Sequence, residues 1–468
     1  MRVTLALLSL VACSGSADPV APVAGPAGPP PDPIAEANLV LVSLDTVRAD
    51  HLSTYGYFRE TTPHLDELAQ ESLLFERCMA PMSTTLPSHT SMFTGVWPLE
   101  HGVMANIKKA EVYVRNERLL SLAEVFEGAG YQTGAFVAAF PLRSGAGLDV
   151  GFDRYGEIQG EARERSAEEV TDEALAWIAE LGESPFFLWV HYFDPHSPYV
   201  EHPETGSFEV SDALKEWLVS RAFTLRAHRE LVKRGTRGRL IDAFEAANLY
   251  DAELRYMDHH FGRLLEVLRS REDWERTVLA VIGDHGDGLN QHGTPGHGYI
   301  WNEQLHVPFL LRVPGMPAGR FAPTVSVVDL APTLLARLQV QVPSKFQSQL
   351  RGVDLLAESF EPRPVVATTS ARKERTDNLD EASLITDRWK YVRRGTMGAS
   401  LFDLIEDPYE LRDVSVLYPD LCDELDALLS SQMAGQTSRG TGHTRPATQD
   451  EIDGLKALGY GGDSDEDE

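Results

Sequence analysis

The chain has little cysteine, few long apolar runs and little positive charge. Its 468 residues include only Cys13, Cys78 and Cys422. So few thiols exclude a disulfide framework, although Cys78 and Cys422 could form one bond. Beyond the first 13 residues no apolar run is long enough to cross a bilayer. There are 42 Lys and Arg against 71 Asp and Glu, a formal net charge of −29. This balance argues against nucleic acid or an anionic membrane surface as a partner.

The first residues form a separate leader. Arg2 precedes a short apolar run, and the sequence Leu-Val-Ala-Cys at 10–13 resembles the lipobox of bacterial lipoproteins, in which the cysteine is acylated after cleavage. A plain secretory peptide cut nearby is the alternative. We expect residues 1–12 to be a lipoprotein signal peptide and Cys13 to carry the lipid. Residues 13–36, rich in Pro, Ala and Gly, should form an extended tether. The chain would then be exported, periplasmic or extracellular, with membrane contact only through this lipid.

Two apolar runs have the composition of strands that are buried on both faces. Residues 38–44 (NLVLVSL) lead into Asp45, and residues 277–282 (TVLAVI) lead through a glycine into Asp284 and His285. Open α/β sheets place their sites at the carboxyl ends of such strands. Carboxylates and an imidazole at these positions are suitable ligands for a divalent metal. The alternatives are a helix cap at Asp45 and a turn with a hydrogen-bonded core histidine at His285.

A segment rich in serine and threonine, STTLPSHTSMFTG, covers residues 83–95. Pro87 suits the first turn of a helix, because its missing N–H is not needed there. A helix that begins near Pro87 places Thr85 at its N-terminus, where backbone N–H groups and the helix dipole favour a bound anion. A hydroxyl becomes a good nucleophile when a base or metal lowers its pKa. Thr85 is therefore a candidate nucleophile, with a simple helix cap as the alternative.

Together these segments resemble the sulfatase family of the alkaline phosphatase superfamily. The family signature has Cys or Ser, any residue, Pro, Ser and Arg; in this chain Thr85 takes the first position and His89 the last. Sulfatases usually have two adjacent aspartates after the first strand, whereas Thr46 takes the second place here. Asp-His at 284–285 is typical of relatives that process phosphates or phosphonates, where sulfatases generally have Asp-Asn. Formylglycine is not expected, because threonine cannot be oxidised to that aldehyde.

The resemblance implies a metal-dependent hydrolase of phosphate, phosphonate or sulfate esters. It implies one divalent ion, Mn²⁺, Zn²⁺, Mg²⁺ or Ca²⁺, with Thr85 on its open side as the nucleophile. It also implies an anionic ester substrate, with His297 as the acid that protonates the leaving oxygen. Transfer of a phosphate-containing head group, or binding of an anionic glycan without turnover, are the alternatives; the missing second Asp and missing Arg favour the latter.

The resemblance also implies three groups of site residues. The implied metal group is Asp45, Asp284, His285 and Thr85, the catalytic group is Thr85, His297 and His196, and the substrate-binding group is His89, Asn106 and His196. His101, His191 and His292 are further histidines that leave these histidine roles open.

The implied fold is α/β, with an alkaline-phosphatase-like central mixed sheet flanked by helices and a small C-terminal α+β subdomain. The expected parts are a catalytic domain at 37–360, the subdomain at 361–434 and an extension with an acidic tail at 435–468. Within them, a helix is expected to open at Tyr250 and residues 436–450 to form a loop. Residues 201–242 fit the family least and carry a basic cluster, either a solvated surface helix or a lining of the cleft: Arg221, Arg226, Arg229, Lys233, Arg234, Arg237 and Arg239. The oligomeric state does not follow from the sequence.

Overall fold

The computed structural model describes residues 32–108, 111–159, 162, 164–223, 242–294, 296–369, 381–395, 398–437 and 443–457. Cys13, the signal peptide, most of the tether and six of the seven basic-cluster residues lie outside these ranges. The seventh, Arg221, stacks on Trp217 and Tyr409. Cys78 and Cys422 are both free thiols. Among the described residues, no helix combines the length and the apolar character that a membrane span needs.

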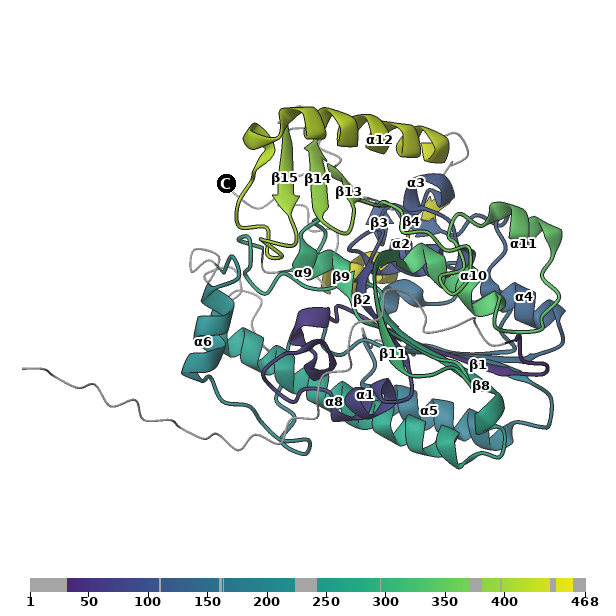
Figure 1. The fold of residues 1–468 in the computed structure, drawn as a ribbon. Helices are drawn as coiled ribbons and strands as arrows, with labels where there is room; N and C mark the ends of the chain where they lie inside the picture. The colour runs from purple at the N-terminus through teal and green to yellow at the C-terminus, as the bar shows by residue number, and fades with distance from the viewer. Residues whose placement is uncertain are drawn as a thin grey trace, which may run out of the picture.

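The core is a nine-stranded mixed sheet (Figure 1). The three central strands are parallel and buried along their whole length, because helices cover both faces of the sheet. One strand, β10, runs antiparallel to both of its neighbours. This architecture confirms the expected fold class. The order across the sheet is β11 (Gly319–Ser326), β2 (Leu73–Met79), β10 (Phe309–Arg312), β8 (Thr277–Gly283), β1 (Asn38–Leu44), β7 (Phe186–Tyr192), β5 (Gln132–Val137) and β6 (Arg154–Gly156), with β9 (His306–Val307) paired to β2.

Helices form a layer on each side of this sheet (Figure 1). One layer contains α1 (Pro63–Ala69), α5 (Ala167–Glu180) and α8 (Ala243–Ser270), and the other contains α2 (Thr85–Thr94), α4 (Leu122–Gly128) and α10 (Leu330–Leu335). The expectation that α8 opens at Tyr250 was wrong. The helix begins at Ala243, because the Asp242 side chain accepts the Glu245 N–H as an N-cap. Shorter helices are α3 (Pro98–His101), α6 (Asp212–Val219), α9 (Asn302–Leu305), α11 (Ser344–Gln349), η1 (Ala49–His51), η2 (Ser53–Tyr55), η3 (Phe140–Leu142), η6 (Trp274–Arg276), η7 (Val327–Asp329) and η9 (Ser415–Leu417).

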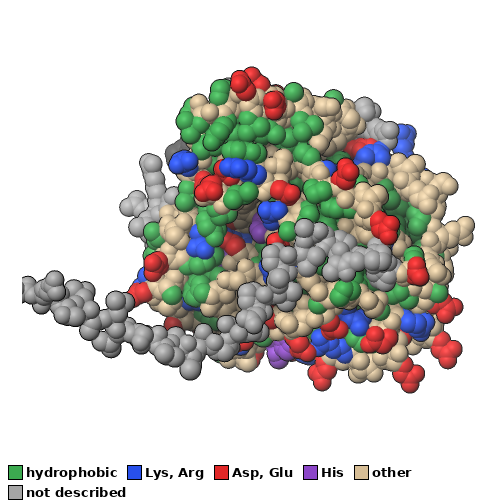
Figure 2. All heavy atoms as spheres, viewed as in Figure 1, with side chains coloured by type: hydrophobic (Ala, Val, Ile, Leu, Met, Phe, Trp, Pro, Cys, Tyr) green, Lys and Arg blue, Asp and Glu red, His purple; other side chains and the backbone are tan. Residues whose placement is uncertain are grey.

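A four-stranded antiparallel sheet forms the C-terminal subdomain. It consists of β12 (Val365–Thr368), β13 (Glu381–Ile385), β14 (Trp389–Arg394) and β15 (Ala399–Asp403), packed against α12 (Pro419–Thr437). The buried Lys390 ammonium lies 2.6 Å from Glu410 and joins this sheet to the loop that precedes α12. Figure 2 shows hydrophobic side chains gathered on the surface over this subdomain. Exposed large apolar residues of this part include Ile405, Leu411, Val416 and Leu417.

The chain end returns to the main body. Residues 436–450 were expected to form a loop, and this was wrong, because they contain the strand β16 (His443–Pro446). This strand pairs antiparallel with β4 (Glu111–Val114), which in turn pairs with β3 (Ile107–Lys108). The helix α13 (Gln449–Ala457) follows, and its Leu455 packs with Val112 and Phe140. The boundaries proposed at 360 and 434 stay predictions.

Candidate active site

Two neighbouring strands bring the first acidic residues together. β1 and β8 are parallel with Leu44 opposite Gly283, so Asp45 and Asp284 leave the sheet at the same edge. The Asp284 N–H donates to the Leu44 carbonyl at 3.1 Å, which holds the two strand ends in this register. Gly286 then lets the backbone pass close to a neighbouring segment. A Cβ at this position would lie 2.1 Å from the Glu303 carbonyl oxygen, so no other residue fits without a backbone shift.

The helix α2 places Thr85 above this edge. It begins at Thr85, two residues before the expected start at Pro87, and all ten of its residues are buried. A helix this polar can be buried because its hydroxyls are hydrogen-bonded: Thr90 and Thr94 each donate to the carbonyl four residues earlier, at 2.7 and 2.6 Å. Ser88 donates to the Asp284 carbonyl at 2.7 Å, which ties the helix to the end of β8. Thr85 is therefore held as the first residue of a fully buried helix whose neighbouring hydroxyls are hydrogen-bonded.

Asp45, Asp284 and His285 converge below Thr85. Their candidate ligand atoms lie within 4.8 Å of one another. Nε2 of His285 is 4.0 Å from Asp45 Oδ1, 3.6 Å from Asp284 Oδ2 and 3.4 Å from the Thr85 hydroxyl. The other ring nitrogen, Nδ1, donates to the Gly286 carbonyl at 2.9 Å. This bond fixes the tautomer in which the Nε2 lone pair points at the carboxylates.

The chemistry of this group fits a divalent cation. Both oxygens of Asp45 and Oδ2 of Asp284 are buried and have no well-formed hydrogen bond to any described residue. Burial raises the pKa of both carboxyls, and the Asp45 charge raises the pKa of Asp284 further. Burial also lowers the pKa of His285 to about 4, although Asp45 opposes this, so the ring stays neutral near pH 7. Two carboxylates and one neutral imidazole are ligands typical of Mn²⁺ and Zn²⁺.

His191 is a neighbour of the metal group that the sequence left unassigned. It lies on β7 beside β1, and its Nδ1 accepts the Ala138 N–H at 3.4 Å. The Nε2–H therefore faces Asp45 Oδ2, which lies 3.4 Å away. Burial lowers the pKa of His191 to about 3. The neutral His191 imidazole thus orients the Asp45 carboxylate. The only signal for this role in the sequence was the position of His191 near the end of a third buried strand.

His89 lies on the protein side of Thr85. Its Nδ1 donates to the Thr85 carbonyl at 2.9 Å and lies 3.5 Å from Asp284 Oδ2. Its Nε2 accepts from the Ser43 hydroxyl at 3.0 Å, and Ser43 in turn accepts the Trp189 indole N–H at 2.8 Å. Burial, and after it the neighbouring His191 imidazole, lowers the pKa of His89 well below 6.5. His89 is therefore a neutral support for Thr85 and does not supply the charge of the arginine that the signature has at this position.

Three more of the predicted residues border the group. The His297 ring lies 4.4 Å from the His285 ring and 5.6 Å from the His196 ring, centroid to centroid. His297 Nδ1 donates to the Ser83 carbonyl at 3.0 Å, which orients the ring. Asn106 accepts the Leu86 N–H at 2.9 Å, while its buried Nδ2 has no acceptor among the described residues. An amide donor and two imidazoles therefore surround the N-terminus of α2.

The remaining histidines serve local structure. His101 bonds to the Ser91 hydroxyl at 3.0 Å, and burial lowers its pKa to about 3. His292 lies 2.9 Å from a Glu303 carboxylate oxygen and stacks on Trp301 with a centroid distance of 3.9 Å. Neither joins the group below Thr85.

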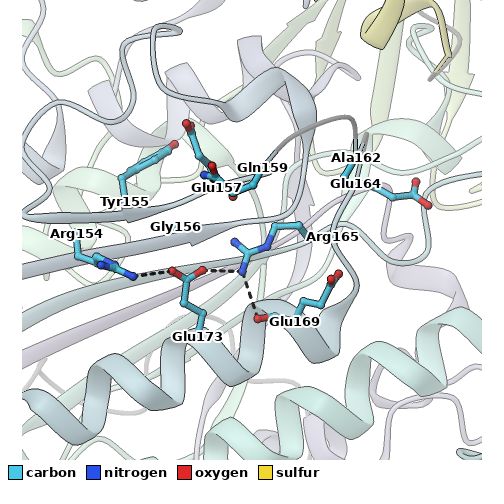
Figure 3. Close-up of a pocket in the computed structure, with 10 residues that line it drawn as sticks. All are labelled: Arg154, Tyr155, Gly156, Glu157, Gln159, Ala162, Glu164, Arg165, Glu169 and Glu173. Atoms are coloured by element: carbon cyan, nitrogen blue, oxygen red, sulfur yellow. Dashed lines mark hydrogen bonds and ion pairs between the residues drawn. The ribbon is translucent and has the colours of Figure 1, made fainter.

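A separate cavity of about 550 Å³ opens at the sheet edge beside β6 (Figure 3). Its two arginines, Arg154 and Arg165, both pair with Glu173, at 3.1 and 2.7 Å. None of the residues predicted for the active site lines it. We therefore place the site at the strand ends below Thr85, where the four central side chains have no exposed surface.

This fold, with acidic residues at the strand ends below a helix N-terminus, is that of the alkaline-phosphatase-like ester hydrolases. Residues 37–340 match the family model described as Sulfatase, so the chain belongs to the sulfatase family and is an ester hydrolase. It is similar to an ulvan-active sulfatase of Formosa agariphila, with 23% identity over 86% of this chain and 82% of that protein. Among solved structures it resembles a phosphonate monoester hydrolase of Agrobacterium radiobacter, with a TM-score of 0.65 and 20% identity over 86% and 96% of the two chains. It also resembles a protein solved with its substrate D-glucosamine-2-N,6-O-disulfate, with a TM-score of 0.69 and 18% identity over 86% and 98%.

Proposed function

We propose that this protein hydrolyses phosphate or phosphonate esters with Thr85 as the nucleophile. One observation carries the proposal: the Thr85 hydroxyl stands at the first position of α2, 3.4 Å from His285 Nε2 and beside the unsatisfied carboxylates. At that place the hydroxyl meets both the metal-ligand group and the helix N-terminus, where an anion is favoured.

Asp45, Asp284 and His285 would hold the metal. His191 lies 3.4 Å from Asp45, and the Thr46 N–H donates to Asp284 Oδ1 at 3.3 Å. The bound cation would supply charge neutralisation and a lower pKa for the hydroxyl. Thr85 Oγ1, after losing its proton to water, would attack phosphorus in line with the ester oxygen, and the phosphorus–oxygen ester bond would break. His297, protonated on both ring nitrogens and oriented through Nδ1, would give the leaving oxygen its Nε2 proton. Water would then hydrolyse the phosphoryl or phosphonyl ester of Thr85, which releases phosphate or the phosphonate and regenerates the hydroxyl.

Asn106 and His196 would hold the other oxygens of the anion. Among the residues that the structure describes, the buried Nδ2 group of Asn106 has no acceptor, which suits a bound oxyanion. His196 is ordered by its bond from Nδ1 to the Ser197 carbonyl at 2.7 Å and by stacking on Phe193. Because His89 is neutral, this pocket relies on hydrogen bonds and the metal for its affinity.

Two features support phosphorus over sulfur. A threonine can form a phosphoester but cannot form the aldehyde hydrate of formylglycine sulfatases. The likeness to a phosphonate monoester hydrolase supports the same direction. A second candidate, anion binding without turnover, is favoured by the zero exposure of the Thr85 side chain. Substrate could reach Thr85 only if the residues above it move.

A panel of esters with one leaving group tests the proposal. The p-nitrophenyl phosphate, phenylphosphonate and sulfate would be assayed with Mn²⁺, Zn²⁺, Mg²⁺ and Ca²⁺. We expect turnover of the phosphorus esters well above that of the sulfate, with no dependence on a formylglycine-generating enzyme. Sulfate turnover above phosphate turnover would contradict the assignment. Metal binding without turnover of any ester would support the non-catalytic candidate.

We also propose that the protein is an exported lipoprotein anchored through Cys13. The lipobox-like residues 10–13 and the Pro-rich stretch after them support this. The tether would then hold the enzyme body away from the membrane surface, as its negative net charge favours.

A further inference from the structure

A second group of metal-ligating side chains lies beside the loop that carries His196. It consists of Asp194, His202 and Glu253, whose candidate ligand atoms lie within 4.8 Å of one another. Asp194 directly follows β7, His202 lies in the loop after it, and Glu253 points from the buried side of α8. None of these residues belongs to the group below Thr85.

Each of the three side chains is oriented as a metal ligand would be. Glu253 Oε1 accepts the Val200 N–H at 2.6 Å, which leaves Oε2 directed at His202 Nε2, 2.8 Å away. The His202 ring stacks on Tyr256 with a centroid distance of 3.8 Å. Its other nitrogen, Nδ1, lies 3.4 Å from Glu204 Oε1. A carboxylate on the far nitrogen is the arrangement that orients metal-binding histidines in proteins.

The Asp194 carboxylate gives an independent observation that this group can bind a cation. Its Oδ2 is inaccessible to solvent and has no hydrogen-bond partner among the described residues. Its candidate ligand oxygen lies within 4.8 Å of a carboxylate oxygen of Glu253. Two carboxylates this close repel each other unless a cation or a proton lies between them.

We propose that Asp194, His202 and Glu253 form a second metal site that takes Zn²⁺ or a similar transition-metal ion. Two carboxylates, one imidazole and a water would complete a four-coordinate shell. Ligand atoms of a tetrahedral zinc lie about 3.4 Å apart, so small side-chain rotations would close the group around the ion. Because Asp194 and His202 flank His196 in sequence and Glu253 belongs to α8, the ion would fasten both ends of the His196 loop to that helix. Its role would be structural, and the inference does not rest on the proposed function.

Metal counting on the full chain tests this site. Wild type, His202→Gln and Glu253→Gln would be loaded with Zn²⁺, desalted and analysed for zinc per folded chain, with Asp284→Ala to mark the first site. We expect about one zinc fewer in each of the two second-site variants than in wild type. The exposed His259, also on α8, provides the control His259→Gln, which should keep the wild-type count. Glu204→Ala should weaken zinc binding at this site by about 10- to 100-fold, because it removes the partner of Nδ1.

The result does not depend on whether Asp284 binds metal, because each variant is compared with wild type. If His202→Gln folds and holds as much zinc as wild type, the site is wrong. If either variant fails to fold, Asp194→Asn gives the same test with nearly unchanged shape, and an unchanged zinc count would again overturn the proposal. Zinc should also protect the 193–211 segment from limited proteolysis in wild type and in His259→Gln, but not in Asp194→Asn.

Discussion

Replacing Thr85 with valine separates the chemistry of the hydroxyl from its packing. Valine has nearly the same shape as threonine, so it keeps the buried methyl group and exchanges the hydroxyl for a second methyl. The hydroxyl lies 3.4 Å from His285 Nε2 and also interacts with the Asp45 carboxyl group. Because these are one long contact and one partner bond, their loss should lower the free energy of unfolding by about 1 to 2 kcal/mol.

The effect on activity should be far larger. If Thr85 is the nucleophile, its loss removes the covalent step and should lower kcat by about 10⁴-fold or more, or about 5 kcal/mol in the activation free energy. Thr85→Ser keeps the hydroxyl and loses one buried methyl group, which should cost about 1 kcal/mol of stability and leave partial activity. Thr84→Val is the matched control, because Thr84 precedes the helix and its side chain makes no capping hydrogen bond.

The assay follows p-nitrophenol release from the best ester of the panel, together with thermal unfolding and metal content of each variant. A quenched reaction of wild type should contain phosphothreonine at residue 85 by mass spectrometry. If Thr85→Val and Thr84→Val turn over the ester equally fast, within about tenfold of wild type, Thr85 is a buried helix residue and the nucleophile lies elsewhere.

Three further predictions concern the metal, a partly buried ion pair and the anchor. Asp284→Ala should lose the zinc of the first site and all ester turnover together; elemental analysis showing an unchanged count would exclude Asp284 as a ligand. Burial alone would raise the pKa of Asp50, but the bidentate Arg48 guanidinium, together with His51 and His306, lowers this pKa from 3.8 to about 2. This stabilisation is present above pH 4 and lost as pH falls through 2, so Asp50→Asn should lower the free energy of unfolding by roughly 2 kcal/mol at pH 6. In urea titrations the difference in the free energy of unfolding between wild type and Asp50→Asn should shrink between pH 4 and 2. A difference that stays constant over this range would show that the ion pair is not its cause. Cys13→Ser should release the protein from membranes into the soluble fraction, and a wild-type mature chain without an acyl group by intact mass would refute the anchor.

The strands that carry the site were predictable because their chemistry is simple. A strand covered by helices on both faces must be mostly apolar, and residues 38–44 and 277–282 are, with hydrogen-bonded polar side chains at only a few positions. Asp45 follows the first strand, and Asp284 and His285 follow the second. These residues lie at the edge of the sheet where the parallel strands have their carboxyl ends. The segment order then matched the sulfatase family, and this gave the fold class and the region of the site.

The ends of helices and the residues that orient the site could not be predicted from the sequence in the same way. α8 extends seven residues before Tyr250, since a cap at Asp242 decides where it starts. The roles of His89 and His191 depend on which nitrogen meets which neighbour, and these neighbours come from other strands. The Asp194, His202 and Glu253 group is also dispersed, because Glu253 lies 51 residues after His202.

The strand β16 has a consequence for how the molecule is assembled. It pairs with β4, which lies some 330 positions earlier in the chain. β4 also pairs with β3, whose first residue, Ile107, directly follows Asn106. Contacts so distant in sequence form late, since the loop between them must close first. While the chain is being synthesised from its N-terminus, the edge of β4 stays open until residue 443 has emerged. The neighbourhood of Asn106 is thus completed only after nearly the whole chain is present, and a protein shortened before β16 would leave that edge exposed permanently.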